Sequence, residues 1–212
     1  AKTRRPYRAC RLNCRLAILS LSLTVLPGCG FPPLVNAPPA ANTICCFGDS
    51  LVAGVGVDDQ TDSFPAVLGE LIGREVSALG TSGASTADGV DLCEQIATDA
   101  CGIVIVTLGG NDIMQQVPYD ETEKNLETIF TNLQTRGAVV VFTCVLSPLS
   151  MSRGRKYKVL CKRMGVLFVP DIMAGIITDP TLRTDEVHPN AEGYRLIAER
   201  VATTLKAAGL VD

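Results

Sequence analysis

The stretch Gly102-Ile-Val-Ile-Val-Thr-Leu-Gly-Gly-Asn-Asp112 decides the fold class of this 212-residue chain. Its centre, Val104-Ile-Val106, is continuously apolar instead of alternating between apolar and polar residues. Val139-Val-Val-Phe142 has the same character further along the chain. Such runs are typical of strands that are buried on both faces, as in parallel sheets covered by helices. The two runs therefore predict an α/β domain.

Short apolar runs and helical repeats alternate from residue 43 onward. Within 122–136, apolar residues recur at helical spacing, and Asn190 is placed to cap a last helix. This alternation predicts a three-layer α/β/α domain over residues 43–212, with a flavodoxin-like five-stranded parallel sheet of strand order 2-1-3-4-5. The strands are expected at Thr43–Phe47, Glu75–Leu79, Gly102–Leu108, Ala138–Leu146 and Val166–Val169.

The loops that follow these strands carry the distinctive residues. Parallel sheets place ligands at the carboxyl ends of their strands, so these loops are expected to meet around one site. Gly48-Asp-Ser-Leu51 follows the first strand, and a glycine-rich segment, Leu79–Thr86, follows the second. Gly109-Gly-Asn-Asp112 follows the third strand, and Asp185-Glu-Val-His188 precedes the last helix.

His188 is the only histidine of the chain, and histidine is the usual general base near neutral pH. Asp185, three residues earlier, could bind the imidazole Nδ1–H and leave Nε2 free for Ser50. Taken singly, a Gly-Asp-Ser turn is usually only a turn, and an Asp-x-x-His pair is usually a capping arrangement. The order of all these motifs, each after the appropriate strand, instead favours a catalytic set.

With these motifs the chain resembles the SGNH (GDSL-type) hydrolases over about residues 43–206. The resemblance is greatest to the branch of periplasmic thioesterase I/lysophospholipases and arylesterases. It implies that Ser50 is the nucleophile and that Asp185 and His188 complete a catalytic triad. It also implies acyl transfer to water through a serine acyl-enzyme.

The resemblance further implies an oxyanion hole. Its donors would be the backbone N–H groups of Ser50 and Gly83 and the side-chain amide of Asn111. The family often has an asparagine several residues before this glycine, where the present chain has Ala78. No metal site or cofactor is predicted, because a single histidine cannot make a histidine-rich zinc site and the cysteines lack paired zinc-ligand spacing.

Residues 146–151, Leu-Ser-Pro-Leu-Ser-Met, follow the fourth strand, and we expect Pro148, Leu149 and Met151 to bind an acyl chain. Three functions stay open: a carboxylic-ester or thioester hydrolase, a carbohydrate O-deacetylase of the same superfamily, and a non-catalytic ligand-binding lipoprotein. We expect a monomer with a small acyl-ester or thioester substrate.

Residues 153–163 contain six Lys or Arg and no acid. We expect a solvated helix face there. The alternative is a landing surface for anionic lipid or for a phosphate-bearing leaving group.

The first 29 residues contain six Lys or Arg and no Asp or Glu, whereas the rest of the chain has 13 basic and 22 acidic residues. The acidic remainder argues against nucleic-acid binding. Leu16–Leu26 is uncharged but shorter than the about 20 residues of a membrane-spanning helix, which predicts a signal peptide over 1–28. Leu26-Pro-Gly-Cys29 resembles a lipoprotein signal, so we expect a lipidated Cys29, a Pro-rich tether over 29–42 and anchoring on the periplasmic side of a membrane. The alternative is cleavage after Ala37, giving a soluble periplasmic or secreted protein.

Six of the nine cysteines lie beyond Cys29, and sequence alone cannot choose among their pairings. We expect mostly free, buried thiols, because several lie within predicted core strands. Cys93–Cys101 is the one local pair that deserves a test. These six residues are Cys45, Cys46, Cys93, Cys101, Cys144 and Cys161.

Overall fold

The computed structural model describes residues 31–96, 101–146 and 150–212. Five parallel strands form one sheet in the order β2-β1-β3-β4-β5, which confirms the predicted α/β topology. The strands are β1 (Ile44–Gly48), β2 (Val76–Gly80), β3 (Ile103–Thr107), β4 (Val139–Thr143) and β5 (Leu167–Val169).

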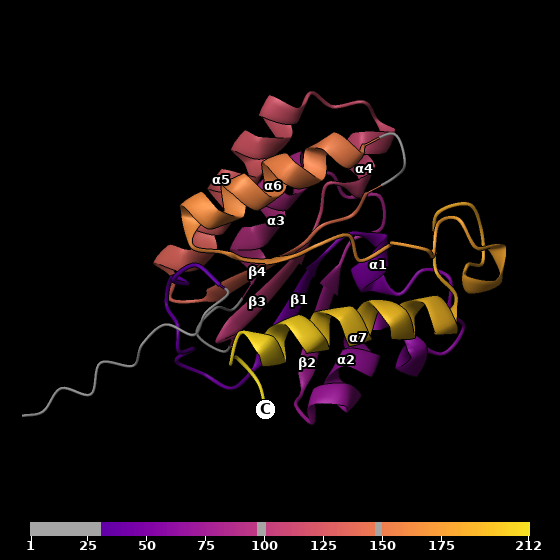
Figure 1. The fold of residues 1–212 in the computed structure, drawn as a ribbon, viewed down its shortest axis with the longest axis horizontal. Helices are drawn as coiled ribbons and strands as arrows, with labels where there is room; N and C mark the ends of the chain where they lie inside the picture. Colours follow the sequence, from indigo (N-terminus) through magenta and orange to yellow (C-terminus); the bar gives the residue numbers. More distant parts are fainter. Residues whose placement is uncertain (1–30, 97–100, 147–149) are drawn as a thin grey trace, which may run out of the picture.

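Helices cover both faces of the sheet, giving three layers (Figure 1). On one face lie α2 (Phe64–Ile72) and α7 (Ala191–Ala207); on the other lie α3 (Thr86–Leu92), α5 (Tyr119–Thr135) and α6 (Met151–Met164). Two short helices, α1 (Ser50–Ala53) and α4 (Gly110–Met114), directly follow β1 and β3. Short 3₁₀ turns complete the elements: η1 (Gln60–Asp62), η2 (Cys93–Gln95) and η3 (Pro180–Leu182).

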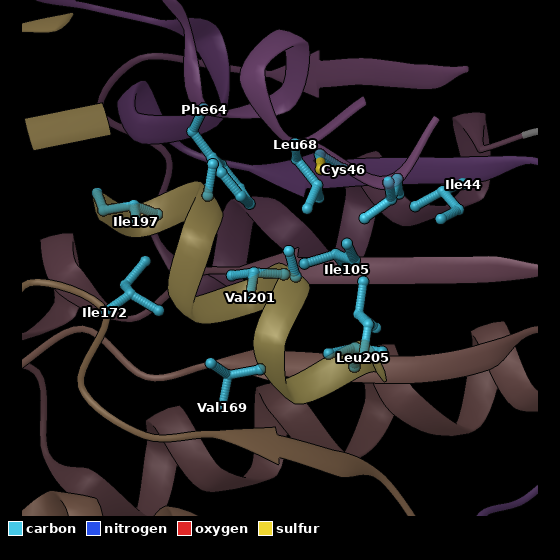
Figure 2. Packing of buried hydrophobic residues seen from close by; sticks show 14 of the residues in the cluster. Ile44, Cys46, Phe64, Leu68, Ile105, Val169, Ile172, Ile197, Val201 and Leu205 are labelled. Carbon is cyan, nitrogen blue, oxygen red and sulfur yellow. The ribbon is translucent and has the colours of Figure 1, made fainter. Parts of the chain in front are cut away.

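The central strand β3 is buried on both faces, which explains its continuous apolar sequence. Ile103 and Ile105 pack toward α2 and α7, while Val104 and Val106 belong to the core under α3, α5 and α6. All four side chains are fully buried. Figure 2 shows the core between the sheet and helices α2 and α7. Its residues include Phe64, Leu68, Ile197, Val201, Leu205, Ile44, Cys46 and Ile105.

The strand predicted at 138–146 is too long by three residues at its end. β4 stops at Thr143, and Val145 and Leu146 turn away to line a pocket beyond the sheet. One part of the apolar run therefore lies in the sheet and the other part lines the pocket, and hydrophobicity alone does not distinguish the two parts. The last helix begins where predicted, because the Asn190 side chain accepts a hydrogen bond from Gly193 N–H at 3.1 Å.

The described part of the predicted tether, residues 31–42, lies against the domain. Val35 N–H donates to Gly165 O at 2.9 Å, and the Asn36 side-chain amide donates to Gln134 O at 2.8 Å and Ala138 O at 3.0 Å. The predicted signal peptide (1–28) and Cys29 lie outside the described residues. In the described part of the chain, no helix has both the length and the apolar character needed to cross a bilayer.

A disulfide joins Cys45 to Cys101, so the suggested Cys93–Cys101 pair is wrong. Cys45 lies on β1, and Cys101 lies two residues before the neighbouring strand β3, which brings their Cα atoms to 5.8 Å. Cys93 remains a buried thiol that donates to Val90 O. The expectation of mostly free, buried thiols holds for Cys46, Cys93, Cys144 and Cys161.

Candidate active site

Ser50 lies at the carboxyl end of β1, as the first residue of α1. Asp49 caps this short helix, since its Oδ1 accepts a hydrogen bond from Leu51 N–H at 3.0 Å. Asp49 is almost completely buried, and this burial raises the pKa of its carboxyl group to about 6. The turn thus holds the Ser50 hydroxyl at the edge of the sheet.

Asp185 and His188 form a compact unit in the loop before α7. One Asp185 carboxylate oxygen accepts from Val187 N–H and His188 N–H, both at 2.8 Å, and the other lies 2.7 Å from His188 Nδ1. The hydrogen bond with the His188 ring, followed by the two backbone N–H groups, lowers the pKa of Asp185 to about 2. The carboxylate is therefore ionised at neutral pH and fixes the orientation of the imidazole.

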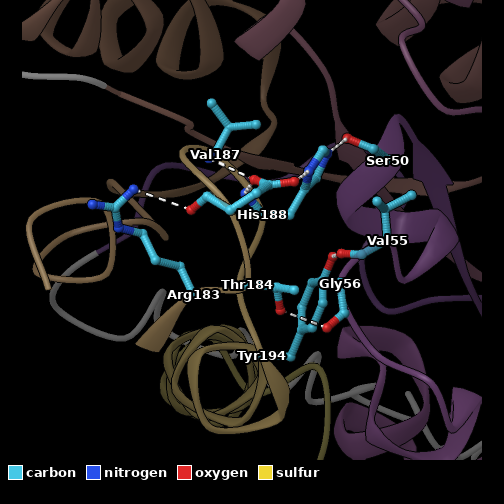
Figure 3. A network of polar contacts seen from close by, with 9 residues as sticks. Ser50, Val55, Gly56, Arg183, Thr184, Val187, His188 and Tyr194 are labelled. Carbon is cyan, nitrogen blue, oxygen red and sulfur yellow. Dashed lines mark hydrogen bonds and ion pairs between the residues drawn. The ribbon is translucent and has the colours of Figure 1, made fainter. Parts of the chain in front are cut away.

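The third contact joins this unit to the serine. His188 Nε2 lies 3.0 Å from Ser50 Oγ, although the two residues are 138 positions apart in the sequence (Figure 3). If the Nδ1 proton points at Asp185, Nε2 is the unprotonated nitrogen and accepts the serine O–H. The structure brings Ser50, His188 and Asp185 together in the arrangement that their spacing predicted.

Two further hydrogen bonds, which sequence reasoning missed, join the segment after α1 to the loop before α7 and to α7 itself. The Thr184 hydroxyl donates to Gly56 O at 2.7 Å, and the Tyr194 hydroxyl donates to Val55 O at 2.6 Å (Figure 3). Both acceptors lie just beyond α1, which carries Ser50. No sequence pattern marks these bonds, because they join segments that only the folded sheet brings together.

A pocket of about 220 Å³ opens beside the triad. Ser50, Gly83, Asn111 and His188 contribute to its wall. The rest of the lining is mainly apolar and comes from α1, from α4 and from the segments after β4, β5 and η3: Leu51, Ile113, Met114, Val145, Leu146, Met173, Ile177 and Val187. The pocket can therefore hold a small apolar group against the Ser50 hydroxyl.

Three residues that carry possible hydrogen-bond donors, Ser50, Gly83 and Asn111, border this pocket. The Asn111 side chain is buried and donates one amide hydrogen to Ala84 O at 2.9 Å, which leaves its second amide hydrogen available. Gly83 has a φ of +81°, in the left-handed region that favours glycine. These three residues, Ser50, Gly83 and Asn111, are the ones predicted to form an oxyanion hole, and all border the same pocket.

Asp112, next to Asn111, forms hydrogen bonds that position the end of the loop that carries Gly83. Its carboxylate accepts from Thr86 N–H at 2.9 Å, from the Thr86 hydroxyl, and from the Thr122 hydroxyl at 3.1 Å. These bonds join the start of α3, α4 and α5. Asp112 was visible in the Gly-Gly-Asn-Asp motif, but its bonding partners were not.

The structure describes one of the three residues predicted to bind an acyl chain. Met151 is the first residue of α6, is 60% exposed and is not among the described residues that line the pocket, so its expected contact with an acyl chain stays a prediction. The start of α6 turns Met151 to solvent, whereas Val145 and Leu146 line the pocket. Pro148 and Leu149 lie outside the described residues.

Residues 46–196 match the GDSL-like lipase/acylhydrolase family. The chain belongs to this family. The matched range includes Ser50, Gly83, Asn111, Asp185 and His188. The GDSL-family assignment makes the chain a member of a hydrolase family and agrees with the geometry around Ser50.

Curated GDSL-type relatives share low sequence identity with the chain. Esterase TesA of Pseudomonas aeruginosa is 25% identical over 195 residues, covering 86% of this chain and 96% of the relative. Thioesterase 1/protease 1/lysophospholipase L1 of Escherichia coli K12 is 26% identical over 177 residues, covering 79% and 85%. Both alignments extend over most of the described domain.

Solved structures agree with the GDSL-family fold. The crystal structure of TesA superposes with a TM-score of 0.71 at 23% identity, covering 78% of this chain and 99% of that chain. The SGNH-hydrolase family esterase AlinE4 superposes with a TM-score of 0.62 at 28% identity, covering 80% and 95%.

Proposed function

We propose that this GDSL-family protein is a serine esterase that hydrolyses carboxylic esters or thioesters through an acyl-enzyme on Ser50. The observation that carries the proposal is the continuous chain of contacts from Ser50 Oγ to His188 Nε2 at 3.0 Å and from His188 Nδ1 to Asp185 Oδ2 at 2.7 Å. The names of two relatives, an esterase and a thioesterase/lysophospholipase, support the same reaction class.

In the first step Ser50 Oγ attacks the carbonyl carbon while His188 Nε2 takes the serine proton. The imidazolium that forms lies against the ionised Asp185 carboxylate, which stabilises its charge. The tetrahedral adduct then collapses, the carbon–oxygen or carbon–sulfur bond breaks, and His188 returns the proton to the departing alcohol or thiol. In the second half a water molecule, activated by His188, hydrolyses the acyl ester on Ser50 and restores the free serine.

The negative charge on the former carbonyl oxygen requires donors. The backbone N–H groups of Ser50 and Gly83 and the free amide hydrogen of Asn111 are the candidates, since all three residues border the pocket. Preorganised donors of this kind each contribute about 2.7–4 kcal/mol to transition-state stabilisation.

The pocket restricts the acyl group. Its volume of about 220 Å³ is below the about 300–1,000 Å³ of pockets that bury drug-sized ligands. Its mainly apolar wall suits a hydrocarbon chain. We therefore expect short acyl groups to be preferred over long ones.

The test is labelling of the full chain with a fluorophosphonate, followed by hydrolysis of p-nitrophenyl esters from acetate to dodecanoate. Ser50→Ala should abolish labelling and lower kcat by about 10⁶-fold, the scale found when a triad nucleophile is removed. Ser82→Ala is the matched control, because Ser82 also borders the pocket, whereas the His188 ring bonds to Ser50 and Asp185. Persistent labelling of the Ser50→Ala protein would contradict the proposal, and turnover of acetylated sugars alone would favour a carbohydrate O-deacetylase.

We also propose that the enzyme is exported and attached to a membrane through a lipid on Cys29. The support is the basic N-terminus, the uncharged Leu16–Leu26 segment and the Leu26-Pro-Gly-Cys29 motif. Cys29→Ala should move the protein from the membrane fraction to the soluble fraction. An unmodified N-terminus at Pro38 in mass spectrometry would instead show cleavage after Ala37.

A further inference from the structure

The outward side of α6 combines cations with exposed apolar side chains. Met151, Arg155, Lys158, Val159 and Lys162 recur at spacings of three and four residues, which places them on one side of the helix. All five are exposed, and Met151 and Val159 are exposed by 60% and 67%. We call these five residues the α6 stripe.

The other basic residues of α6 are engaged by the protein itself. Arg163 pairs with Glu123 at 3.0 Å and with Glu127, Lys156 lies over the Tyr119 ring, and the Arg153 guanidinium donates to a backbone carbonyl. In the described parts of the chain, by contrast, no ion pair involves the three cations of the α6 stripe. Their charge is therefore available to a partner.

The stripe runs toward the catalytic pocket. Near its start, Gly154 packs so closely on Leu146 that an added Cβ would lie 2.9 Å from a Leu146 methyl group, and Leu146 lines the pocket. Met114, another lining residue, is 59% exposed.

The other end of α6 lies beside the N-terminal segment. Gly165, which ends the helix, accepts the hydrogen bond from Val35 N–H, and Val35 is itself 40% exposed. The helix thus extends from the N-terminal segment to the pocket, and Figure 1 shows α6 as an outer helix of the molecule.

We propose that the α6 stripe docks on an anionic phospholipid bilayer. The chain beyond residue 29 is acidic overall, yet six of its 13 basic residues fall within 153–163. A localised basic surface of this kind orients the protein on negatively charged lipid, and the interleaved Met151 and Val159 can enter the interfacial layer. An acidic protein surface would match the cations but gives no reason for apolar side chains between them. The proposal rests on α6 alone and requires neither lipidation of Cys29 nor catalysis at Ser50.

The absence of tryptophan from the sequence makes a direct test available. Val159→Trp in the full chain reports the surroundings of the stripe, and Thr203→Trp, at an exposed position of α7 on the other side of the sheet, is the matched control. On vesicles that contain phosphatidylglycerol with brominated acyl chains, we expect blue-shifted and quenched emission from Trp at 159 and solvent-like emission from Trp at 203. If only the N-terminus inserted into the vesicle, the emission of Trp at 159 and the emission of Trp at 203 would respond equally.

Charge variants complete the test. Arg155→Gln/Lys158→Gln/Lys162→Gln in the Val159→Trp background should weaken vesicle binding by about fivefold per residue removed, measured as the lipid concentration that gives half of the full emission shift. Lys124→Gln/Arg195→Gln/Lys206→Gln should leave this concentration unchanged. Equal signals from both reporters, an equal response to phosphatidylcholine alone, or a shift caused by a soluble acidic polypeptide but not by vesicles would each overturn the proposal. Hydrolysis of a soluble ester by the same proteins tests catalysis separately, so a failure of either proposal is recognised independently.

Discussion

The Thr184 hydroxyl and the Gly56 carbonyl oxygen are joined by a 2.7 Å hydrogen bond that links the loop of Asp185 and His188 to the segment that follows Ser50. Thr184 precedes Asp185, and Gly56 lies just beyond the helix that begins with Ser50. The approach is close: Gly56 has a φ of +107°, and an added Cβ there would lie 2.4 Å from Pro189 O. The distance between His188 and Ser50 therefore depends on how these loops pack.

Thr184→Val should lower kcat about fivefold to tenfold with little change in KM, because the lost bond, worth about 1 kcal/mol, positions the histidine rather than the substrate. Thr184→Ser should restore most of the rate. Steady-state kinetics on ester substrates measure both, with Thr178→Val as the control threonine. A larger change in KM than in kcat would contradict a positioning role.

Asp185→Asn should lower kcat by about 10⁴-fold while the protein stays folded, because the neutral amide neither stabilises the imidazolium nor enforces the correct tautomer. The measured kcat should exceed that of His188→Ala. Glu186→Gln, which alters the neighbouring exposed carboxylate, should leave the rate unchanged. The lowered pKa of Asp185, about 2, also affects folding. The ionised carboxylate contributes to the free energy of unfolding, and this contribution is fully present above pH about 4 and is lost as the pH falls toward 2. Full activity of Asp185→Asn would remove the residue from the triad.

Asn111→Ala should lower kcat by about 10²–10³-fold and change KM far less, because the amide meets charge that appears only in the transition state. The substitution also removes the 2.9 Å bond to Ala84 O, so the melting temperature must be measured on the same preparation. If stability falls while kcat per folded molecule stays within about threefold of the wild-type value, Asn111 only supports its loop, since a lost donor costs about 2.7 kcal/mol or more.

Asp49→Asn should make the protein more stable at pH 7–8. The buried carboxyl has its pKa raised from 3.8 to about 6, so the folded state binds more protons than the unfolded state between these values and the free energy of unfolding falls as the pH rises. The neutral amide removes this loss, worth up to about 3 kcal/mol, and still accepts from Leu51 N–H. Urea unfolding from pH 4 to pH 8 measures the effect. Asp62→Asn, at an exposed position, should leave the profile unchanged, and a parallel profile for Asp49→Asn would refute the prediction.

Removal of the disulfide by Cys45→Ala/Cys101→Ala should lower the free energy of unfolding by about 4 kcal/mol, since the bond closes a loop across 56 residues. A reducing agent should destabilise the wild-type protein by a similar amount and should not affect the double variant. Cys93→Ala, which removes a buried free thiol, is the control for lost packing. Identical unfolding midpoints with and without reductant would show that Cys45 and Cys101 are not paired.

The sequence by itself predicted the strand order of the sheet and the three residues, Ser50, Asp185 and His188, that the structure brings into contact. Val104-Ile-Val106 had to be buried on both faces, which requires a parallel sheet with two helix layers. Such a sheet collects the segments after its strands at one edge, so Ser50 and Asn111 were expected there. The Asp185–His188 spacing is local, and local geometry depends on few other residues. The expected helix cap at Asn190 held for the same reason.

Only the tertiary structure decided the features that depend on contacts between distant segments. Cys45 pairs with Cys101, and not Cys93 with Cys101, because β1 and β3 are neighbours in the sheet. Val145 and Leu146, and not Met151, line the pocket because β4 ends at Thr143 and α6 turns its first residue outward. In each case composition and spacing are compatible with several partners, and the packing of the whole sheet selects one of them.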